Sequence, residues 1–293
     1  MKIRAYAKIN LALDVVSRRE DGYHDLKMIM APITLHDLIY IDIINQGIVI
    51  ECNNKAIPTD QRNIMYRVAE YLIDHYKLNK GVKMTLYKHI PSQAGLAGGS
   101  ADGAAILKAM NTLFKLKLSN EELAKIGKTI GADIPFCVYE KIALVEGIGE
   151  KLQFINQELN CHLLLVKPSK GVSTKTAFNK LDIENAIHKD CHEMQTAIIN
   201  QDYQNIVNNL QNTLEQPAFE MVPEIKKIKD KMIQLGFDGS LMSGSGSCVF
   251  GITQDENILN QGYKYFKNKY RFVKKSKILN QSDKKNEYNE MKS

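Results

Sequence analysis

The chain has 293 residues, of which 44% are hydrophobic and 25% are charged, and this composition fits one large globular domain or two modest ones. No apolar run approaches the length of about 18 residues that marks a membrane span, and the N-terminus leads directly into alternating sequence. We therefore expect no membrane contact, no secretion signal and a cytoplasmic location. The five scattered cysteines favour reduced thiols over a disulfide framework or a zinc site.

The net charge of +6 is concentrated near the C-terminus. Residues 264–293 hold ten Lys or Arg and three Asp or Glu, which leaves the rest of the chain close to neutral. A Lys- and Asn-rich end of this kind is typical of a solvated segment. We interpret residues 276–293 as a basic, flexible tail and expect no nucleic-acid partner.

Strict alternation of residues 3–15 predicts a strand with one buried face. Lys8 and Asn10 lie on the opposite face of that strand. The pattern then predicts a turn at residues 21–22, strands within residues 26–53, a helix over residues 64–72 and a strand over residues 82–86 that Pro91 ends.

The second half of the chain mixes helices and strands. Ser119 and Glu122 form a capping box for a helix that should end at Gly131. The later patterns predict strands within residues 142–167 with a turn at 147–150, mainly helices over 168–235, and a strand–loop–strand unit in "FDGSLMSGSGSCVFGI" at 237–252. This mixture without regular βαβ alternation indicates the α+β class. We place a domain boundary between residues 1–158 and 159–275.

A stretch of small residues, "PSQAGLAGGSADGAA", occupies residues 91–105, between a predicted strand and a predicted helix. Free N–H groups at a helix start, together with glycines that allow close approach, make phosphate the natural ligand. Close packing of the helix through glycine and alanine remains an alternative. The stretch has no lysine of a P-loop and lacks the G-x-G-x-x-G spacing, so its cation must come from elsewhere.

The segment P-x-x-x-G-L-A-G-G-S resembles the phosphate loop of the GHMP kinases. Four further segments are similar to the same family, in the same order along residues 5–252: "AYAKINLALDVVSRREDGYHDL", "GADIPFCV", "ALVEGIGEKL" and "LMSGSGSCVFGI". The resemblance implies an α+β fold of two domains with the active site in the cleft between them. The N-terminal domain would be ribosomal-protein-S5-domain-2-like, and the C-terminal domain ferredoxin-like.

The motifs K-I-N-L and D-G-Y-H are similar to one branch of this family. That resemblance implies ATP-dependent phosphorylation of the 2-hydroxyl of 4-diphosphocytidyl-2-C-methyl-D-erythritol, in non-mevalonate isoprenoid precursor synthesis. The implied ligands are this small molecule, ATP and Mg²⁺, and the expected state is a monomer or weak homodimer. A homoserine- or mevalonate-type kinase would not need Tyr23 and His24. A non-catalytic, ligand-sensing relative would not need both Lys8 and Asp133.

The resemblance also implies roles for individual residues. Lys8 would be the catalytic lysine rather than a solvated strand lysine, and Asp133 would be the general base rather than a turn residue. The implied substrate-binding residues are Asn10, Tyr23, His24 and Phe178, although Phe178 is nearly as well explained as a core residue. The implied ATP-binding residues are Pro91, Ser92, Gln93, Ala94, Gly95, Leu96, Ala97, Gly98, Gly99, Ser100 and Ala101.

Three features of these motifs leave questions open. Ser100 is followed by Ala101 where the family usually has a second hydroxyl, so one hydroxyl remains for the phosphates. Gly244 and Gly246 either bring backbone near the site and brace the phosphate loop, or form a plain turn. No carboxylate pair suggests the magnesium ligands, which stay unassigned.

Overall fold

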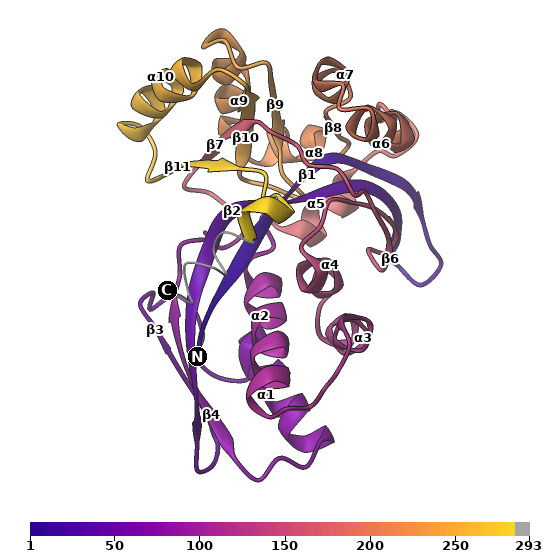
Figure 1. Cartoon of the computed structure of the whole chain (residues 1–293). Coiled ribbons are helices and arrows are strands. Elements are labelled where there is room, and N and C mark those ends of the chain that lie inside the picture. Colours follow the sequence, from indigo (N-terminus) through magenta and orange to yellow (C-terminus); the bar gives the residue numbers. More distant parts are fainter. Residues whose placement is uncertain (285–293) are drawn as a thin grey trace. The chain divides into compact units, whose positions relative to one another are not determined.

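The structure is a computed structural model that describes residues 1–284 (Figure 1). Internal contacts divide the chain into two units. The first unit comprises Met1–Ala7, Leu35–Ser92 and Ala97–Glu140, and the second comprises Lys8–Thr34, Gln93–Leu96 and the described residues from Lys141 onward. Two long strands, β1 (Lys2–Arg18) and β2 (His24–Ile44), contribute residues to both units. The sequence-based boundary at residues 158 and 159 stays a prediction.

The first unit places helices beside a short run of strands. Strand β4 pairs antiparallel with residues 38–44 of β2 and parallel with β3. Gly103 lets α1 approach α2 closely, because a Cβ at that position would crowd Ile64. The elements are β3 (Ile48–Cys52), α1 (Ile64–His75), β4 (Gly81–Tyr87), α2 (Gly98–Leu113), α3 (Asn120–Ile130) and α4 (Ile134–Tyr139).

The second unit contains a four-stranded sheet in the order β11-β7-β10-β9, with α9 and α10 packed on it. This strand order confirms the expected ferredoxin-like architecture. Strand β5 pairs with β2 and with β6, and β8 pairs parallel with β1. The elements are β5 (Ala143–Gly147), β6 (Lys151–Phe154), β7 (His162–Lys167), α5 (Thr174–Lys180), α6 (Cys191–Ile199), α7 (Tyr203–Asn208), β8 (Gln211–Asn212), α8 (Glu215–Met221), α9 (Glu224–Gln234), β9 (Gly239–Met242), β10 (Val249–Thr253), α10 (Glu256–Lys267) and β11 (Phe272–Lys277).

Local sequence signals fixed several elements correctly. The capping box forms at the start of α3, where Ser119 and the Glu122 side chain satisfy each other's backbone N–H groups.

The expectation of one buried face for β1 was wrong, because residues 5–15 are buried on both faces. Met28 and Ser243 both contact Asn10, and they help to cover the face that carries the polar side chains.

The glycine segment after β9 braces the phosphate loop within the second unit. Ser247 N donates to the Gln93 carbonyl and Cys248 N donates to the Ala94 carbonyl, both at 3.2 Å. The Ser243 hydroxyl donates to the Gly95 carbonyl at 2.9 Å. The bracing interpretation of this segment is therefore correct.

The phosphate loop and the glycine segment after β9 approach each other most closely at Gly95. It has a φ of +70°, and a Cβ built on it would overlap the backbone carbonyl oxygen of Ser243. Backbone atoms cannot rotate away as a flexible side chain can. A glycine is required here for its conformation and also for its lack of volume.

We predict that Gly95→Ala lowers the free energy of unfolding by about 2–4 kcal/mol, since it adds left-handed strain to overpacking. Gly99→Ala is the matched control, because a Cβ there meets only the Ile64 side chain and alanine favours the helix. Chemical denaturation of both variants measures the difference. Equal stability of the two variants would contradict the bracing contact.

The start of the basic tail needs correction. Ser276 and Lys277 belong to β11, and Ile278, Leu279 and Asn280 are buried. Leu279 N donates to the Pro32 carbonyl at 2.8 Å, and Asn280 Oδ1 accepts from Leu159 N at 3.2 Å. These apolar and ladder contacts outweigh the basic composition of the segment. Residues 285–293 of the expected tail lie outside the described residues.

We predict that ending the chain at residue 284 leaves the melting temperature nearly unchanged and keeps kcat within a few-fold of the value for the intact protein. Ending it at residue 275 should unfold or strongly destabilise the protein, because it removes part of β11 and two buried apolar side chains. Thermal melting of the two truncations tests this. A truncation at residue 275 that melts like the intact protein would show that the packing of residues 276–280 is dispensable.

Candidate active site

The phosphate loop ends in a helix start that is open to an anion. Ala97 precedes α2 in the left-handed conformation and gives no side-chain cap. The helical hydrogen bonds begin with Ala101 N donating to the Ala97 carbonyl at 2.9 Å. Within the described residues, the N–H groups of Gly98, Gly99 and Ser100 have no acceptor. Free N–H groups and the positive end of the helix dipole favour a phosphate at this position.

Ser100 lies beside the segment that carries the predicted base. A Cβ built on Gly131 would be 3.8 Å from the Ser100 hydroxyl oxygen. Asp133 follows two residues later, half-buried at the start of α4, and its side chain makes no cap hydrogen bond. The first unit therefore brings together the end of the phosphate loop and the backbone around Asp133.

Lys8 is a buried cation in the second unit, and its side chain is held by a neutral partner. Its side chain donates from Nζ to Asn10 Oδ1 at 2.7 Å, and the residue is only 5% exposed. No carboxylate pairs with it in the part of the chain that the structure describes. A buried charge without a counter-charge is costly, so this arrangement suits a site that receives an anion. A solvated strand lysine would be exposed instead.

The phosphate-loop residues in the second unit lie near the Lys8 ammonium group. Lys8 N donates to the Leu96 carbonyl at 3.2 Å, which joins β1 to the loop. A Cβ built on Gly244 would be 3.4 Å from Lys8 Nζ and 3.0 Å from the Gly95 carbonyl oxygen. Both Lys8 and the loop therefore lie beside Gly244.

Two of the predicted substrate-binding residues, His24 and Phe178, form an aromatic pair in the second unit. The rings of His24 and Phe178 are 5.0 Å apart at an interplanar angle of 35°. Phe178 is half-buried, and its role in substrate binding stays a prediction. The Tyr23 side chain is 62% exposed, and no aromatic or polar group of the described chain engages its ring.

Exposed ion pairs hold the turn that carries Tyr23, and burial favours the neutral form of His24. Arg19 pairs with Asp21 and Asp25, and the Asp21 carboxylate accepts from Tyr23 N at 3.0 Å. Burial, with a smaller contribution from Arg18, lowers the pKa of His24. A neutral imidazole has one donor and one acceptor, which suits the polar edge of a nucleobase.

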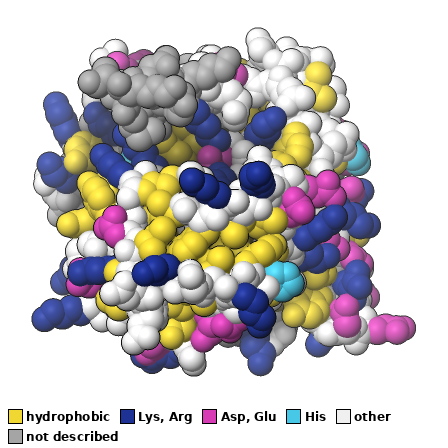
Figure 2. All heavy atoms as spheres, turned by 60° about the horizontal axis from the view of Figure 1, so that its bottom comes forward, with side chains coloured by type: hydrophobic (Ala, Val, Ile, Leu, Met, Phe, Trp, Pro, Cys, Tyr) yellow, Lys and Arg dark blue, Asp and Glu magenta, His cyan; other side chains and the backbone are white. Residues whose placement is uncertain are grey.

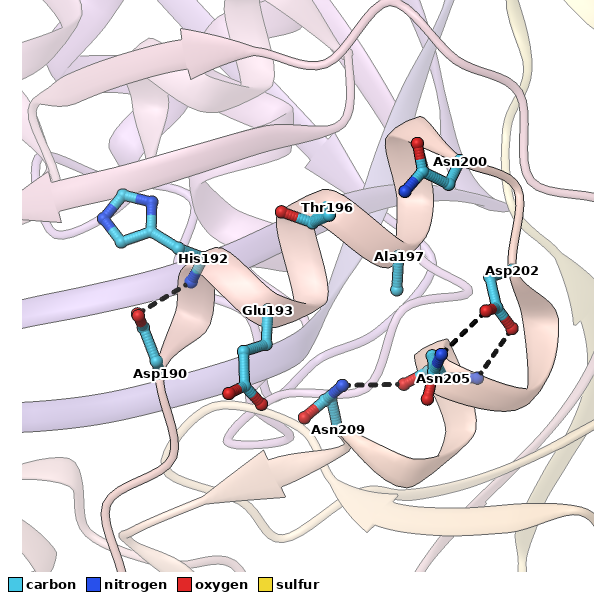
Figure 3. A pocket seen from close by; sticks show the side chains of 9 residues that line it. All are labelled: Asp190, His192, Glu193, Thr196, Ala197, Asn200, Asp202, Asn205 and Asn209. Atoms are coloured by element: carbon cyan, nitrogen blue, oxygen red, sulfur yellow. Dashed lines mark hydrogen bonds between the residues drawn. The ribbon is translucent and has the colours of Figure 1, made fainter.

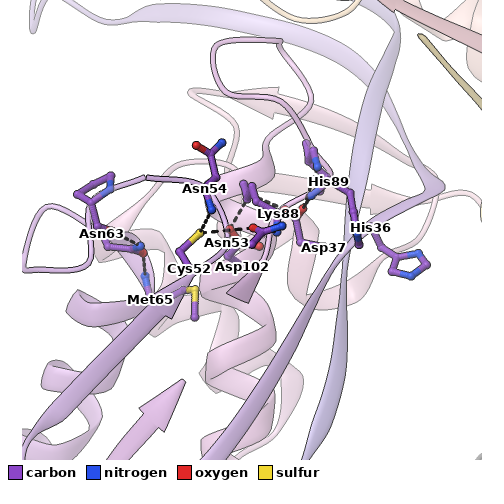
Figure 4. Close-up of polar contacts among 12 residues, drawn as sticks. His36, Asp37, Cys52, Asn53, Asn54, Asn63, Met65, Lys88, His89 and Asp102 are labelled. Carbon is purple, nitrogen blue, oxygen red and sulfur yellow. Dashed lines mark hydrogen bonds and ion pairs between the residues drawn. The ribbon is translucent and has the colours of Figure 1, made fainter. Parts of the chain in front are cut away.

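Sequence reasoning missed a buried charge cluster in the first unit (Figure 4). Lys88 Nζ forms ion pairs with Asp37 and, at 2.7 Å, with Asp102. The Asp37 carboxylate also accepts from the backbone N–H groups of His89 and Ile90. A Cβ built on Gly98 would lie 3.1 Å from Lys88 Nζ, so this ammonium group lies at the first residue of α2. The loop therefore has a nearby cation, but two carboxylates already pair with it.

The register of β2 and β4 could have revealed this cluster. Leu38 pairs with Tyr87, so Asp37 and Lys88 lie opposite each other at the end of the ladder. The sequence alone did not fix that register, and Asp102 lies in a helix that begins ten residues after Lys88. No local spacing therefore connected the three residues.

Two open pockets lie away from these residues. Helices α6 and α7 border one of them, shown in Figure 3, which is lined by Asp190, His192, Glu193, Thr196, Ala197, Asn200, Asp202, Asn205 and Asn209. Asp190 and Asp202 accept from backbone N–H groups at the starts of α6 and α7, so their carboxylates act as helix caps. The other pocket is lined by Arg67, Glu70, Tyr71, Asp74, His75, Thr129 and Ile130. Neither contains a predicted site residue.

The surface drawn in Figure 2 has no field of a single sign. Lysine and arginine side chains are interspersed with acidic ones, and hydrophobic side chains are exposed between them. Among the described residues, no helix combines the length and apolar character of a membrane span.

Comparison with known proteins covers almost the whole chain. The family models for the GHMP kinases N terminal domain and the GHMP kinases C terminal domain match residues 63–141 and 194–271. The chain is 44% identical over 274 residues to 4-diphosphocytidyl-2-C-methyl-D-erythritol kinases of Clostridium botulinum (strain Kyoto / Type A2) and of Clostridium acetobutylicum. Each match covers 93% of this chain and 98% of the relative.

Solved structures agree with this assignment. A crystal structure of 4-(cytidine 5'-diphospho)-2C-methyl-D-erythritol kinase has a TM-score of 0.80 at 30% identity and covers 94% of this chain and 99% of its own. A homoserine kinase from Cytophaga hutchinsonii has a TM-score of 0.74 at 17% identity, covering 96% and 95%, and shares the fold alone. The chain therefore belongs to the GHMP kinase family and is a small-molecule phosphotransferase.

Proposed function

We propose that this protein transfers the γ-phosphate of ATP to the 2-hydroxyl of 4-diphosphocytidyl-2-C-methyl-D-erythritol, in the non-mevalonate route to isoprenoid precursors. The observation that carries the proposal is the 44% identity to kinases of that name over 98% of their length. The aromatic group around His24 supports a cytosine-bearing substrate. Homoserine and mevalonate, the acceptors of other family members, carry no base to stack.

The direct test is an ATP-consumption assay with purified protein and a panel of acceptor alcohols. The panel contains the cytidine diphosphate-linked methylerythritol, homoserine and mevalonate, with an acceptor-free reaction as background. We expect turnover only with the first compound. Turnover with homoserine or mevalonate instead would reassign the acceptor, and no turnover with any would favour a ligand-sensing relative.

For catalysis we propose that Asp133 removes the proton of the acceptor hydroxyl and that Lys8 stabilises the resulting charge and the transferred phosphoryl group. Phosphoryl transfer depends mainly on positioning and electrostatic stabilisation. The Lys8 side chain is held by the Asn10 amide, and no carboxylate among the described residues competes with the reacting anions for it. The open start of α2 would hold the ATP phosphates, with Ser100 supplying the one hydroxyl.

Mg²⁺ would enter with ATP. Among residues 1–284, no group of three or more His, Cys, Asp or Glu side chains is arranged to hold a metal ion. Mg²⁺ commonly binds through substrate phosphates and water with only one or two protein carboxylates, so this chemistry fits the site. The ion would neutralise phosphate charge, and no residue is assigned as its ligand.

We also propose a cytoplasmic location. All five cysteines are free thiols, and four of them are buried. Free thiols of this kind are typical of a reducing compartment. The expectation of a monomer or weak homodimer stays a prediction.

We predict that Asp133→Asn lowers kcat at least about 100-fold, the low end for loss of a general base. Lys8→Met, which keeps length and removes the charge, should cause a similar loss. The double variant should be little worse than the worse single variant, because both groups act on one transition state. Single-turnover kinetics with the cytidine substrate measure this, and calorimetry checks that substrate binding persists. Near-normal kcat in both single variants would overturn the mechanism.

We predict that Tyr23→Ala and Phe178→Ala raise the KM for the cytidine substrate roughly 5- to 150-fold, because stacking contributes about 1–3 kcal/mol per base. The KM for ATP should stay nearly unchanged in both variants. Tyr40→Ala is a suitable control, since Tyr40 is an exposed tyrosine in the first unit. An equal loss of ATP affinity would place these rings at the nucleotide instead.

A further inference from the structure

Asp102 has an unusual environment for a carboxylate on a nucleotide-binding helix. The residue is 4% exposed, and its Oδ2 accepts from Lys88 Nζ at 2.7 Å. Its Oδ1 is fully buried and has no hydrogen-bond partner in the part of the chain that the structure describes. A buried, unpartnered carboxylate oxygen is costly when the group is charged, and much less so when the group is neutral.

In the cluster around Asp102, the carboxylates outnumber the ammonium groups. Lys88, which directly follows β4, and Asp37 of β2 are the charged groups that act on Asp102. On the other side of α2, the apolar side chains of Ile64 and Val68 of α1 and of Ile134 of α4 approach the neighbouring Gly103. One ammonium group therefore faces two carboxylates, and no further cation among residues 1–284 balances the second.

Asp37 accepts more hydrogen bonds than Asp102 does, and one of them comes from the Lys88 ammonium group. Its carboxylate is completely buried and accepts from Lys88 Nζ and from the backbone N–H groups of His89 and Ile90. The Asp37 carboxylate therefore has hydrogen bonds to spare, whereas Oδ1 of Asp102 has no partner among the described residues. The proton that neutralises the cluster therefore belongs on Asp102.

The cluster lies close enough to the proposed phosphate site to respond to it. The Lys88 ammonium group lies against Gly98, whose N–H is one of the free donors at the start of α2. A triphosphate at that helix start adds negative charge near Asp102. The added negative charge favours the neutral form of the Asp102 carboxyl group, because two like charges close together in a buried site repel each other.

We propose that ATP binding is coupled to the uptake of one proton by Asp102. The proton comes from the buffer and adds to a carboxylate oxygen, which leaves the Asp37–Lys88 pair intact and electrically neutral. Asp102 then acts as a positioning residue, because a neutral cluster holds the start of α2 without repelling the phosphates. This inference rests on the proposed nucleotide site.

The direction of the pH dependence follows from the protonation state of Asp102 in the enzyme without ATP. Burial, the largest cause, raises the pKa of Asp102 to about 8, although Lys88 lowers it. Below this pH the group is already protonated, so ATP binding should take up almost no proton. Above it the free enzyme has lost the proton, and ATP must restore it. ATP affinity should therefore fall as the pH rises above about 8.

The experiment is isothermal titration of Mg·ATP into the full-length enzyme without acceptor, in buffers that differ in ionisation enthalpy. At about pH 9 the wild-type protein should take up close to one proton per ATP, and at about pH 7 almost none. Its Kd for ATP should rise about 10-fold between these values. ATP binding without buffer dependence at the higher pH would overturn the inference and leave the proposed function standing. Absence of ATP binding would overturn both.

Asp102→Asn is the decisive variant, because its amide resembles the neutral carboxyl group. It should bind ATP with a Kd near the wild-type value at neutral pH, take up no proton, and keep that Kd at the higher pH. Asp42→Asn is the control, since Asp42 is an exposed aspartate of β2 in the same unit, and it should behave as wild type. Proton uptake that persists in a folded Asp102→Asn protein would assign the proton elsewhere and overturn the inference. The wild-type titration decides the question alone if that variant does not fold.

Discussion

The approach of Gly95 to Ser243 is the contact on which the arrangement of the second unit depends. It joins a loop near residue 95 to a segment 148 residues later, and it leaves no space for a side chain at Gly95. Because Lys8 donates from its backbone to Leu96 and lies beside Gly244, the same contact also positions Lys8. The glycines of the two motifs are therefore required mainly so that three backbone segments can meet.

The two buried lysines near the phosphate loop have opposite electrostatic environments. Lys8 has an amide partner and no carboxylate, so its charge remains available to an incoming anion. Lys88 has two carboxylates, so its charge is already neutralised by the protein. A P-loop combines both tasks in one lysine within the loop. Here one lysine is suited to the chemistry and the other to holding the helix start.

The sequence predicted those features that depend on neighbouring residues. The alternation of residues 3–15, the capping box at Ser119 and the strand–loop–strand unit at 237–252 all have a local cause, and the structure contains each of them. It did not predict that both faces of β1 are buried, because that depends on distant residues such as Ser243. The packing of residues 276–280 was missed for the same reason, since their partners Pro32 and Leu159 are far away in the chain.

The candidate site was predicted mainly by motif and only partly by physical reasoning. A glycine-rich loop indicates an anion, but it does not say which cation balances it or which carboxylates surround it. The Asp37–Lys88–Asp102 cluster depends on the register of β2 against β4, and a shift of one residue would have moved Asp37 to the other face. Register is a property of the folded sheet, and charge neutralisation at this loop follows from it. The electrostatics of the proposed nucleotide site are therefore set by sheet pairing as much as by the glycine-rich loop itself.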